Sequence, residues 1–327
     1  MKKQCLTWLR RGVIAALLFI PLSVVAQAIR DEGILPALTP DTLGINADWK
    51  KDVWGNVPVY QITAELEKVS VLPFSPAERE AALSLVLADV SGAALNQSVE
   101  GKFLYSRLQA AVALGAFDAV INIYQQLPDR YQNGVFFNAY WDALFGAGFA
   151  EKACVLLETQ QDSADSQKRR IGCLLTQGKK DEAVLAFEVY HEQPDDDVVF
   201  QNWGRAALMD MPAEAAELAA RLRDVPLIQA AGIAPQGEMS WGVSKSLGRD
   251  MPRMPRTNVA TIYAPEQVAD VQTTVMHSAG LGVLKALALL QASPAVELPL
   301  MLAIQPVMPP TLWHALLTER AGFAHAP

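Results

Sequence analysis

Segments with helical periodicity recur in the middle of the chain at a spacing just above 30 residues, and this repeat constrains the fold more than any other feature. The apolar pattern predicts helices over residues 100–114, 117–127, 133–146, 150–161, 164–177, 180–193, 197–209 and 212–223. A small or turn-forming residue separates the two helices of each pair, and successive breaks lie 33, 30 and about 32 residues apart, at Gly115, Gly148, Gly178 and the corner Asp210-Met211-Pro212. Helix pairs with this period predict an all-α fold, an α-solenoid of antiparallel pairs.

An alanine follows each break near the start of the second helix: Ala119, Ala153, Ala183 and Ala216. A small side chain there lets two antiparallel helices approach closely. The stretch from Leu174 to Phe187 reads Leu-Leu-x-x-Gly-x-x-Asp-x-Ala-x-x-x-Phe and resembles the middle of a tetratricopeptide repeat, whose second helix carries Ala-x-x-x-Phe after the turn. The resemblance covers about residues 100–225, although Ala119 is followed by Tyr124 rather than by an aromatic residue four positions on. It implies a concave binding surface and no chemistry.

The first 28 residues have the features of a secretory signal peptide. Four basic residues accompany an apolar run over 12–26 that ends in Ala26-Gln27-Ala28, which predicts cleavage after Ala28 and a periplasmic or secreted protein of bacterial type. An uncleaved membrane anchor is the alternative, but the run is short for about 30 Å of hydrocarbon. Cleavage would leave 299 residues with 23 basic and 35 acidic side chains, a net charge of −12. We do not expect such a chain to bind nucleic acid, which favours a basic face.

The remaining sequence predicts four further regions. Residues 29–74 are interrupted by proline and glycine and predict an irregular strap anchored by Trp49, Trp54 and Tyr60. The helical-repeat domain is expected over 75–231 and opens with a capping box, Ser75-Pro76-Ala77-Glu78. Residues 232–258 are rich in glycine, proline and serine and predict a linker or an ordered loop.

Residues 259–327 predict a C-terminal helical region that closes the solenoid, with helices over 265–291, 296–304 and about 311–321. The apolar run 281–304 also raises the possibility of a membrane span. Lys285, Gln291 and Glu297, together with two prolines, interrupt this run, and a charge at mid-span is costly, so buried helices are expected instead. Gly280-Leu281-Gly282 predicts a close helix crossing rather than a dinucleotide loop, because no strand precedes it.

Cys154 and Cys173 predict a disulfide bond. One lies early in the helix 150–161 and the other late in the helix 164–177, so that an antiparallel hairpin places them at nearly the same height. Two reduced cysteines packed in the core are the alternative. The run Asp195-Asp196-Asp197 precedes a helix and predicts an N-terminal cap rather than a calcium site, since it lacks the turn glycine and the distal glutamate.

No catalytic motif or metal-binding spacing is present, and we expect no cofactor and no enzyme activity. His191, His277, His314 and His325 share no spacing that would gather two of them on one helix face, and no Gly-x-Ser-x-Gly or Ser-x-x-Lys motif occurs. Some periplasmic lytic transglycosylases join a helical solenoid to a small catalytic domain built around a Glu-Ser pair. Glu238 lies in a comparable position, but Met239 separates it from Ser240, so Glu238 is retained only as an alternative.

The expected function is a non-enzymatic scaffold that binds a protein or peptide partner in the cell envelope. The first helices of the pairs would line its concave face, with aromatic side chains as candidate anchors: Phe103, Tyr105, Phe136, Phe137, Tyr140, Trp141 and Trp203. The alternative reading of these aromatic residues is that they fill the core between helix layers. The competing functions are a peptidoglycan-acting lytic enzyme and a structural subunit of a secretion or motility assembly. A net negative chain favours basic or neutral partners.

Overall fold

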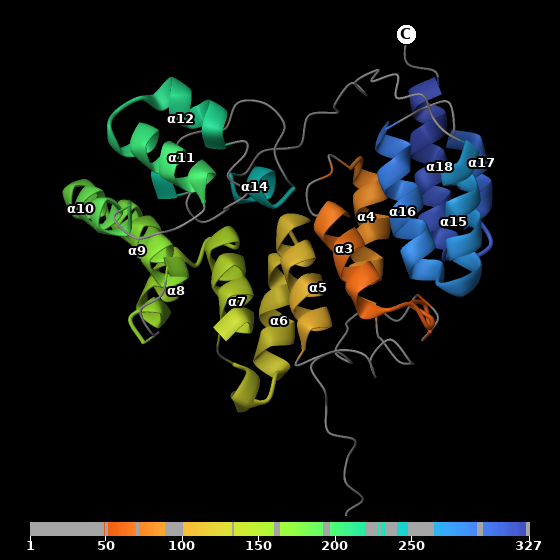
Figure 1. Cartoon of the computed structure of the whole chain (residues 1–327), viewed down its shortest axis with the longest axis horizontal. Helices are drawn as coiled ribbons and strands as arrows, with labels where there is room; N and C mark the ends of the chain where they lie inside the picture. Colours follow the sequence, from red (N-terminus) through yellow and green to blue (C-terminus); the bar gives the residue numbers. More distant parts are fainter. Residues whose placement is uncertain are drawn as a thin grey trace, which may run out of the picture. The chain divides into compact units, whose positions relative to one another are not determined.

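The structure is a computed structural model, and it describes residues 49, 52–69, 72, 74–88, 101–132, 134–159, 164–191, 197–219, 228, 230–232, 241–247, 265–292 and 297–324. These residues belong to one compact unit, Pro40–Pro327. Every regular element within them is a helix (Figure 1), which confirms the all-α class. The signal peptide over 1–28, the strap residues before Trp49, Asp195, Asp196, Glu238 and His325 lie outside the described residues.

The eight predicted helices of the middle region are present as four consecutive pairs. Their bounds are α5 (Lys102–Ala113) and α6 (Phe117–Gln126), α7 (Gly134–Gly146) and α8 (Ala150–Leu157), α9 (Ala164–Thr176) and α10 (Lys180–His191), α11 (Val198–Leu208) and α12 (Pro212–Ala219). A short 3-10 helix, Asp129–Tyr131, lies between α6 and α7. Each helix contacts the next one along the chain, and α5 also contacts α7. This arrangement is compatible with a helical repeat.

The four breaks share one backbone geometry. Gly115, Gly148, Gly178 and Asp210 have left-handed φ angles of 74°, 87°, 72° and 60°. In each turn the next residue donates its amide to the carbonyl five positions earlier, as in a Schellman motif: Ala116 to Ala111, Phe149 to Leu144, Lys179 to Leu174 and Met211 to Ala206. A left-handed residue is required at these points, and Asp210 supplies it where the other three pairs use glycine.

The four pairs have equivalent core positions at fixed distances along the sequence from their left-handed residues. The fifth residue after each left-handed residue has 0% exposure in all four pairs: Val120, Ala153, Ala183 and Ala215. The ninth is buried in all four as well: Tyr124, Leu157, Phe187 and Ala219. The close-packed position was predicted at Ala119 and Ala216. By this register it is Val120, one residue later, in the first pair and Ala215, one residue earlier, in the fourth. In the corrected register, Tyr124 lies four residues after Val120, the same spacing as Ala183 to Phe187.

The expectation that residues 29–74 are irregular is wrong for the helix α3 (Val59–Val69). Ile62, Leu66 and Val69 are buried at helical spacing, and Pro58 immediately precedes the helix, where proline is tolerated. Of the three predicted anchors of this region, two are buried and one is exposed. Trp49 is buried, and its indole Nε1 donates to Ser84 Oγ at 2.9 Å.

The second tryptophan of this region, Trp54, is also buried and meets the ring of Phe103 edge-on at 5.8 Å between centroids. Tyr60 is 68% exposed and anchors nothing in the core. The backbone before α3 is further fixed by a hydrogen bond from Gly280 N to Val53 O at 2.8 Å. The segment that leads into α3 is thus part of the core, whereas Tyr60, in the first turn of α3, faces solvent.

The predicted capping box is present at α4 (Pro76–Val86): Ser75 Oγ accepts from Glu78 N, and Glu78 Oε2 accepts from Ser75 N at 2.9 Å. The Glu78 carboxylate is buried and also forms an ion pair with Arg320 and accepts from Gln291 Nε2. Arg320 lies 3.2 Å from a second carboxylate, that of Glu297. The start of α4 is therefore bound directly to two helices of the C-terminal region, and Arg320 links these contacts to a third.

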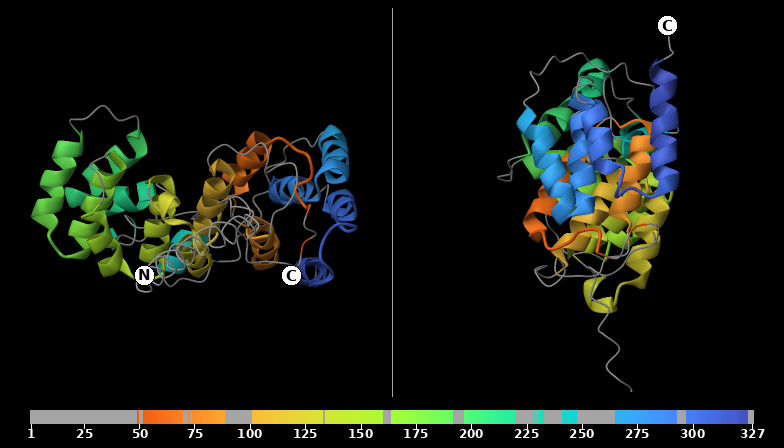
Figure 2. Two further views of the ribbon diagram at one scale, coloured as in Figure 1. Left: turned by 90° about the horizontal axis from the view of Figure 1, so that it is seen from below. Right: turned by 90° about the vertical axis from the view of Figure 1, so that its right-hand side faces the viewer.

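The C-terminal region contains α15 (Pro265–His277), α16 (Ala279–Ala292), α17 (Glu297–Ile304) and α18 (Pro310–Ala324). It packs against the first helices of the chain, because α16 contacts α3 and α4, and α18 contacts α4. Figures 1 and 2 show these blue helices beside the orange ones in each view. None of the described helices is long and apolar enough to cross a membrane.

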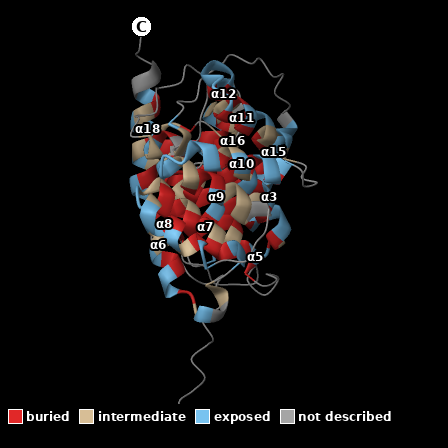
Figure 3. Cartoon of the chain, turned by 90° about the vertical axis from the view of Figure 1, so that its left-hand side faces the viewer, coloured by how far each residue is buried: buried red, intermediate tan, exposed pale blue. Residues whose placement is uncertain are grey.

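The predicted close crossing at Gly280 and Gly282 is confirmed. A Cβ atom on Gly282 would lie 2.8 Å from the backbone of Val275 in α15, and one on Gly280 would lie 3.0 Å from the ring of Trp54. Figure 3 shows that the helices carry buried residues beside exposed ones, as packed amphipathic helices require.

The expected linker over 232–258 contains a helix, α14 (Trp241–Ser246), which contacts α5 and α7. The segment was expected to be a linker because glycine, proline and serine surround this helix in the sequence. Its position is set by tertiary contacts with helices that end 95 or more positions earlier in the sequence. Residues 233–240 and 248–258 of this segment lie outside the described residues.

Candidate functional site

The aromatic residues proposed as partner anchors lie mainly in the core. Phe103, Phe136, Phe137, Tyr140, Trp141 and Trp203 are buried, and Tyr105 is half-buried. Trp141 and Trp203 each lie seven residues before the left-handed turn residue of their pair, at the same position as the buried Leu108 and Ile171. The alternative reading, that these residues fill the core, agrees with the burial of all of them but Tyr105.

Two of these aromatic residues bind neighbouring helices directly. Tyr140 stacks on Tyr124 with ring centroids 4.1 Å apart, and the Tyr124 hydroxyl donates to Gln132 O at 2.7 Å. Burial, and then the neighbouring Tyr140, raises the pKa of Tyr124 to about 12. Trp141 Nε1 donates to Ala153 O in the second helix of its pair at 2.8 Å. These contacts are structural: they join α6 to α7 and α7 to α8.

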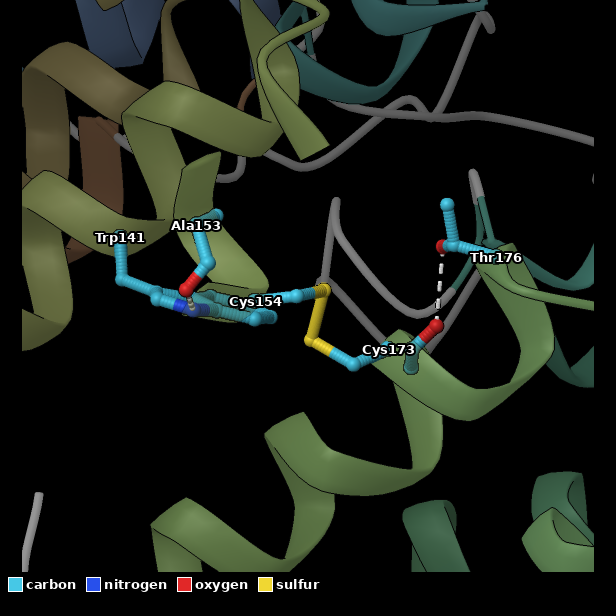
Figure 4. The surroundings of a disulfide bond; sticks show 6 residues. Trp141, Ala153, Cys154, Cys173 and Thr176 are labelled. Carbon is cyan, nitrogen blue, oxygen red and sulfur yellow. Dashed lines mark hydrogen bonds between the residues drawn. A yellow bond between two sulfur atoms is a disulfide. The ribbon is translucent and has the colours of Figure 1, made fainter. Parts of the chain in front are cut away.

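The predicted disulfide is present between Cys154 in α8 and Cys173 in α9, with their Cα atoms 5.6 Å apart (Figure 4). Since α8 ends one pair and α9 begins the next, the bond joins two successive pairs. Figure 4 shows Trp141 on the α8 side of the bond. A cavity of about 310 Å³ borders the disulfide, with Arg170 and Lys179 among its lining residues.

A second connection joins the third pair to the fourth. Asp197 caps α11 by accepting from Phe200 N at 3.0 Å, as predicted, and it accepts from Lys168 Nζ of α9 at 2.8 Å. Burial alone would raise the pKa of Asp197, but the hydrogen bonds from Lys168 and from Phe200 N, together with the Lys168 charge, lower it below its usual value. Asp210, the turn residue of this fourth pair, forms a further ion pair with Lys180 of α10.

A groove of about 820 Å³ lies between α3, the residues before it, α15 and α16. Its most exposed apolar side chains are Tyr60 at 68% and Met276 at 77%. Lys285 lies deeper and donates to Asp270 at 2.9 Å and to Thr274 Oγ1 at 3.3 Å. The groove therefore presents two exposed apolar side chains beside a hydrogen-bonded polar cluster.

Sequence reasoning named Tyr60 as a core anchor and did not identify this groove. Its walls come from segments about 210 residues apart, Asn56–Glu65 and Asp270–Lys285. No local pattern reports that these segments meet. An aromatic residue on the polar side of an amphipathic helix was the one available signal.

Within the described residues, no group of three or more His, Cys, Asp or Glu side chains could hold a metal ion. No family model, no curated protein and no solved structure shows significant similarity to the chain.

Proposed function

We propose that this chain is an exported, tetratricopeptide-like α-solenoid that binds a protein or peptide partner in the bacterial cell envelope without catalysing a reaction. The observation that carries the proposal is the common geometry of four successive helix pairs, each with the same left-handed turn and the same two buried positions after it. Repeated pairs that bury one another present an extended surface, which is the usual basis of partner binding in helical repeats.

The groove between α3, α15 and α16 is the proposed partner site. Tyr60 and Met276 are exposed there although each has a large apolar surface, and Tyr is enriched among the side chains that dominate binding energy at interfaces. Six aromatic residues of the repeat are not available for this role because they are buried: Phe103, Phe136, Phe137, Tyr140, Trp141 and Trp203.

The disulfide between Cys154 and Cys173 supports a location outside the reducing cytoplasm. The predicted signal peptide points to the same compartment. The net charge of −12 expected after cleavage favours a basic or neutral partner.

The test is site-specific photo-crosslinking in the periplasm of a bacterium that expresses the full chain. A photoreactive phenylalanine analogue replaces Tyr60 in one variant and Leu185, which is 63% exposed on α10, in a control variant. We expect a discrete crosslinked partner from position 60 and none of the same mass from position 185. Equal labelling at both positions, or no adduct at position 60, contradicts the proposal.

A further inference from the structure

The helix α14 lies on the first two pairs of the repeat, which are far from it in the sequence. It spans Trp241–Ser246 and contacts α5 and α7, the first helices of these pairs (Figure 1). Six residues are too few for a helix to be stable alone in water, so its conformation depends on these contacts. The surface that receives α14 is therefore a binding site for a short helix, occupied here by the chain itself.

Gly242 brings the backbone of α14 against the end of α5. A Cβ atom at this position would lie 2.4 Å from Val112 O and 3.2 Å from Ala113 O. Both obstacles are backbone atoms, which cannot move aside as a flexible side chain can. The receiving surface thus selects a residue without a side chain at this point of the bound helix.

Lys245, three residues later and on the same helix face, supplies the polar contact. Its Nζ donates to Gly115 O at 2.7 Å and lies 5.5 Å from the centroid of the Phe117 ring. Gly115 follows the last turn of α5, where free carbonyl groups and the helix dipole favour a cation. The neighbouring carbonyl, Leu114 O, accepts from Arg79 Nε at 2.7 Å. The end of α5 is accordingly a receptor for cationic side chains.

We propose that this surface, formed by the end of α5, Phe117 and α7, binds a helical segment of a partner protein that carries glycine and, three residues later, lysine. In this proposal α14 is an internal occupant that the partner segment displaces. The proposal rests on the partner-binding function above and adds to it a second surface and the chemistry of the segment it accepts. A net negative chain complements such a cationic segment.

The test uses a fluorescein-labelled peptide with the sequence of residues 238–249 and the full chain after signal cleavage. The variant Gly242→Ala/Lys245→Ala releases α14, and Lys152→Ala removes an exposed lysine of α8 as the matched control. Fluorescence anisotropy should show saturable binding to the double variant. Wild type and the control should bind the peptide at least about tenfold more weakly. In these chains α14 occupies the same surface more than about nine-tenths of the time and so competes with the peptide.

Two peptide controls make the result specific. Replacing the peptide's lysine by norleucine, or its glycine by leucine, should abolish binding to the double variant. Equal binding of these peptides, or equal binding of the parent peptide to wild type and double variant, overturns the proposal. A variant that fails to fold is recognised by circular dichroism and replaced by Lys245→Ala alone, which retains the glycine contact.

Hydrogen exchange on the wild-type chain gives an independent measurement. A displaceable α14 must open without global unfolding, so its amides should exchange faster than those of α5. Exchange of both helices at the same slow rate shows that α14 is a fixed part of the core and overturns the proposal. None of these results depends on the crosslinked partner, so failure here leaves the proposed function to its own test.

Discussion

Removal of the Cys154–Cys173 disulfide should destabilise the junction between the second and third helix pairs. The bond joins α8 to α9, and both cysteines are buried, at 7% and 6% exposure. The double variant Cys154→Ala/Cys173→Ala removes the cross-link and leaves small side chains in a site that already excludes most solvent.

The expected magnitude follows from the length of the closed loop. The two cysteines are 19 residues apart, and in the chain-entropy model a loop of this size restricts the unfolded chain enough to contribute about 3 kcal/mol to the free energy of unfolding. Because α8 and α9 also contact each other directly, the native structure should survive the loss, with a lower resistance to urea.

Urea unfolding followed by circular dichroism measures this free energy for wild type with and without dithiothreitol, and for the double variant. We expect reduced wild type and the variant to lose similar stability, and dithiothreitol to have no effect on the variant. A loss below about 1 kcal/mol would refute the loop-entropy reasoning. Free thiols in denatured, unreduced wild type would refute the bond itself.

Three further predictions concern packing and charge. Gly204→Ala should destabilise the chain by about 1–3 kcal/mol in urea unfolding, because its Cβ would lie 2.3 Å from the Phe187 ring, and Phe187→Leu in the same chain should restore part of the loss. The pKa of Asp197 is lowered in the folded state, so its contribution to stability is present above the usual aspartate pKa. This contribution is lost as the pH falls through the lower folded-state pKa. Asp197→Asn should therefore flatten the dependence of the unfolding free energy on pH in this acidic range. Arg320→Met should cost about 3–5 kcal/mol by leaving the buried Glu78 carboxylate without its cation, and Glu78→Gln added to it should recover stability; an unchanged urea midpoint for Arg320→Met contradicts the pairing.

Local sequence signals predicted the elements that depend on local physics. Gly115, Gly148 and Gly178 were identifiable because a left-handed turn residue is nearly always glycine, and the apolar period on each side fixed the helices. The cap at Ser75 and the cap at Asp197 were predicted for the same reason, since the side chain and its acceptor amide lie within three residues of each other. The disulfide followed because two helices joined by a short turn place residues at equal distance from that turn beside each other.

The sequence did not predict which face of a helix is buried when both faces carry apolar residues. Helix α7 is apolar nearly all round, so periodicity could not separate Tyr140 and Trp141 from a surface. The turn register resolves this ambiguity: Trp141 and Trp203 share the position seven residues before the turn, and both are core residues. Helix pairs whose side chains differ too much to be aligned by sequence can thus still be aligned by their shared turn geometry.

The C-terminal closure shows the limit of reasoning along the chain. A solenoid has two open ends, and the order of the sequence suggests that residues 259–327 cover the end that follows α12. They pack instead on α3 and α4, at the beginning of the described chain. One buried ion pair accompanies this packing: the Glu78 carboxylate needs a cation in the core, and Arg320 provides it from 242 positions away. The Glu78–Arg320 ion pair therefore joins α4 to α18, a contact that the capping box alone does not predict because a capping-box glutamate is ordinarily exposed to solvent.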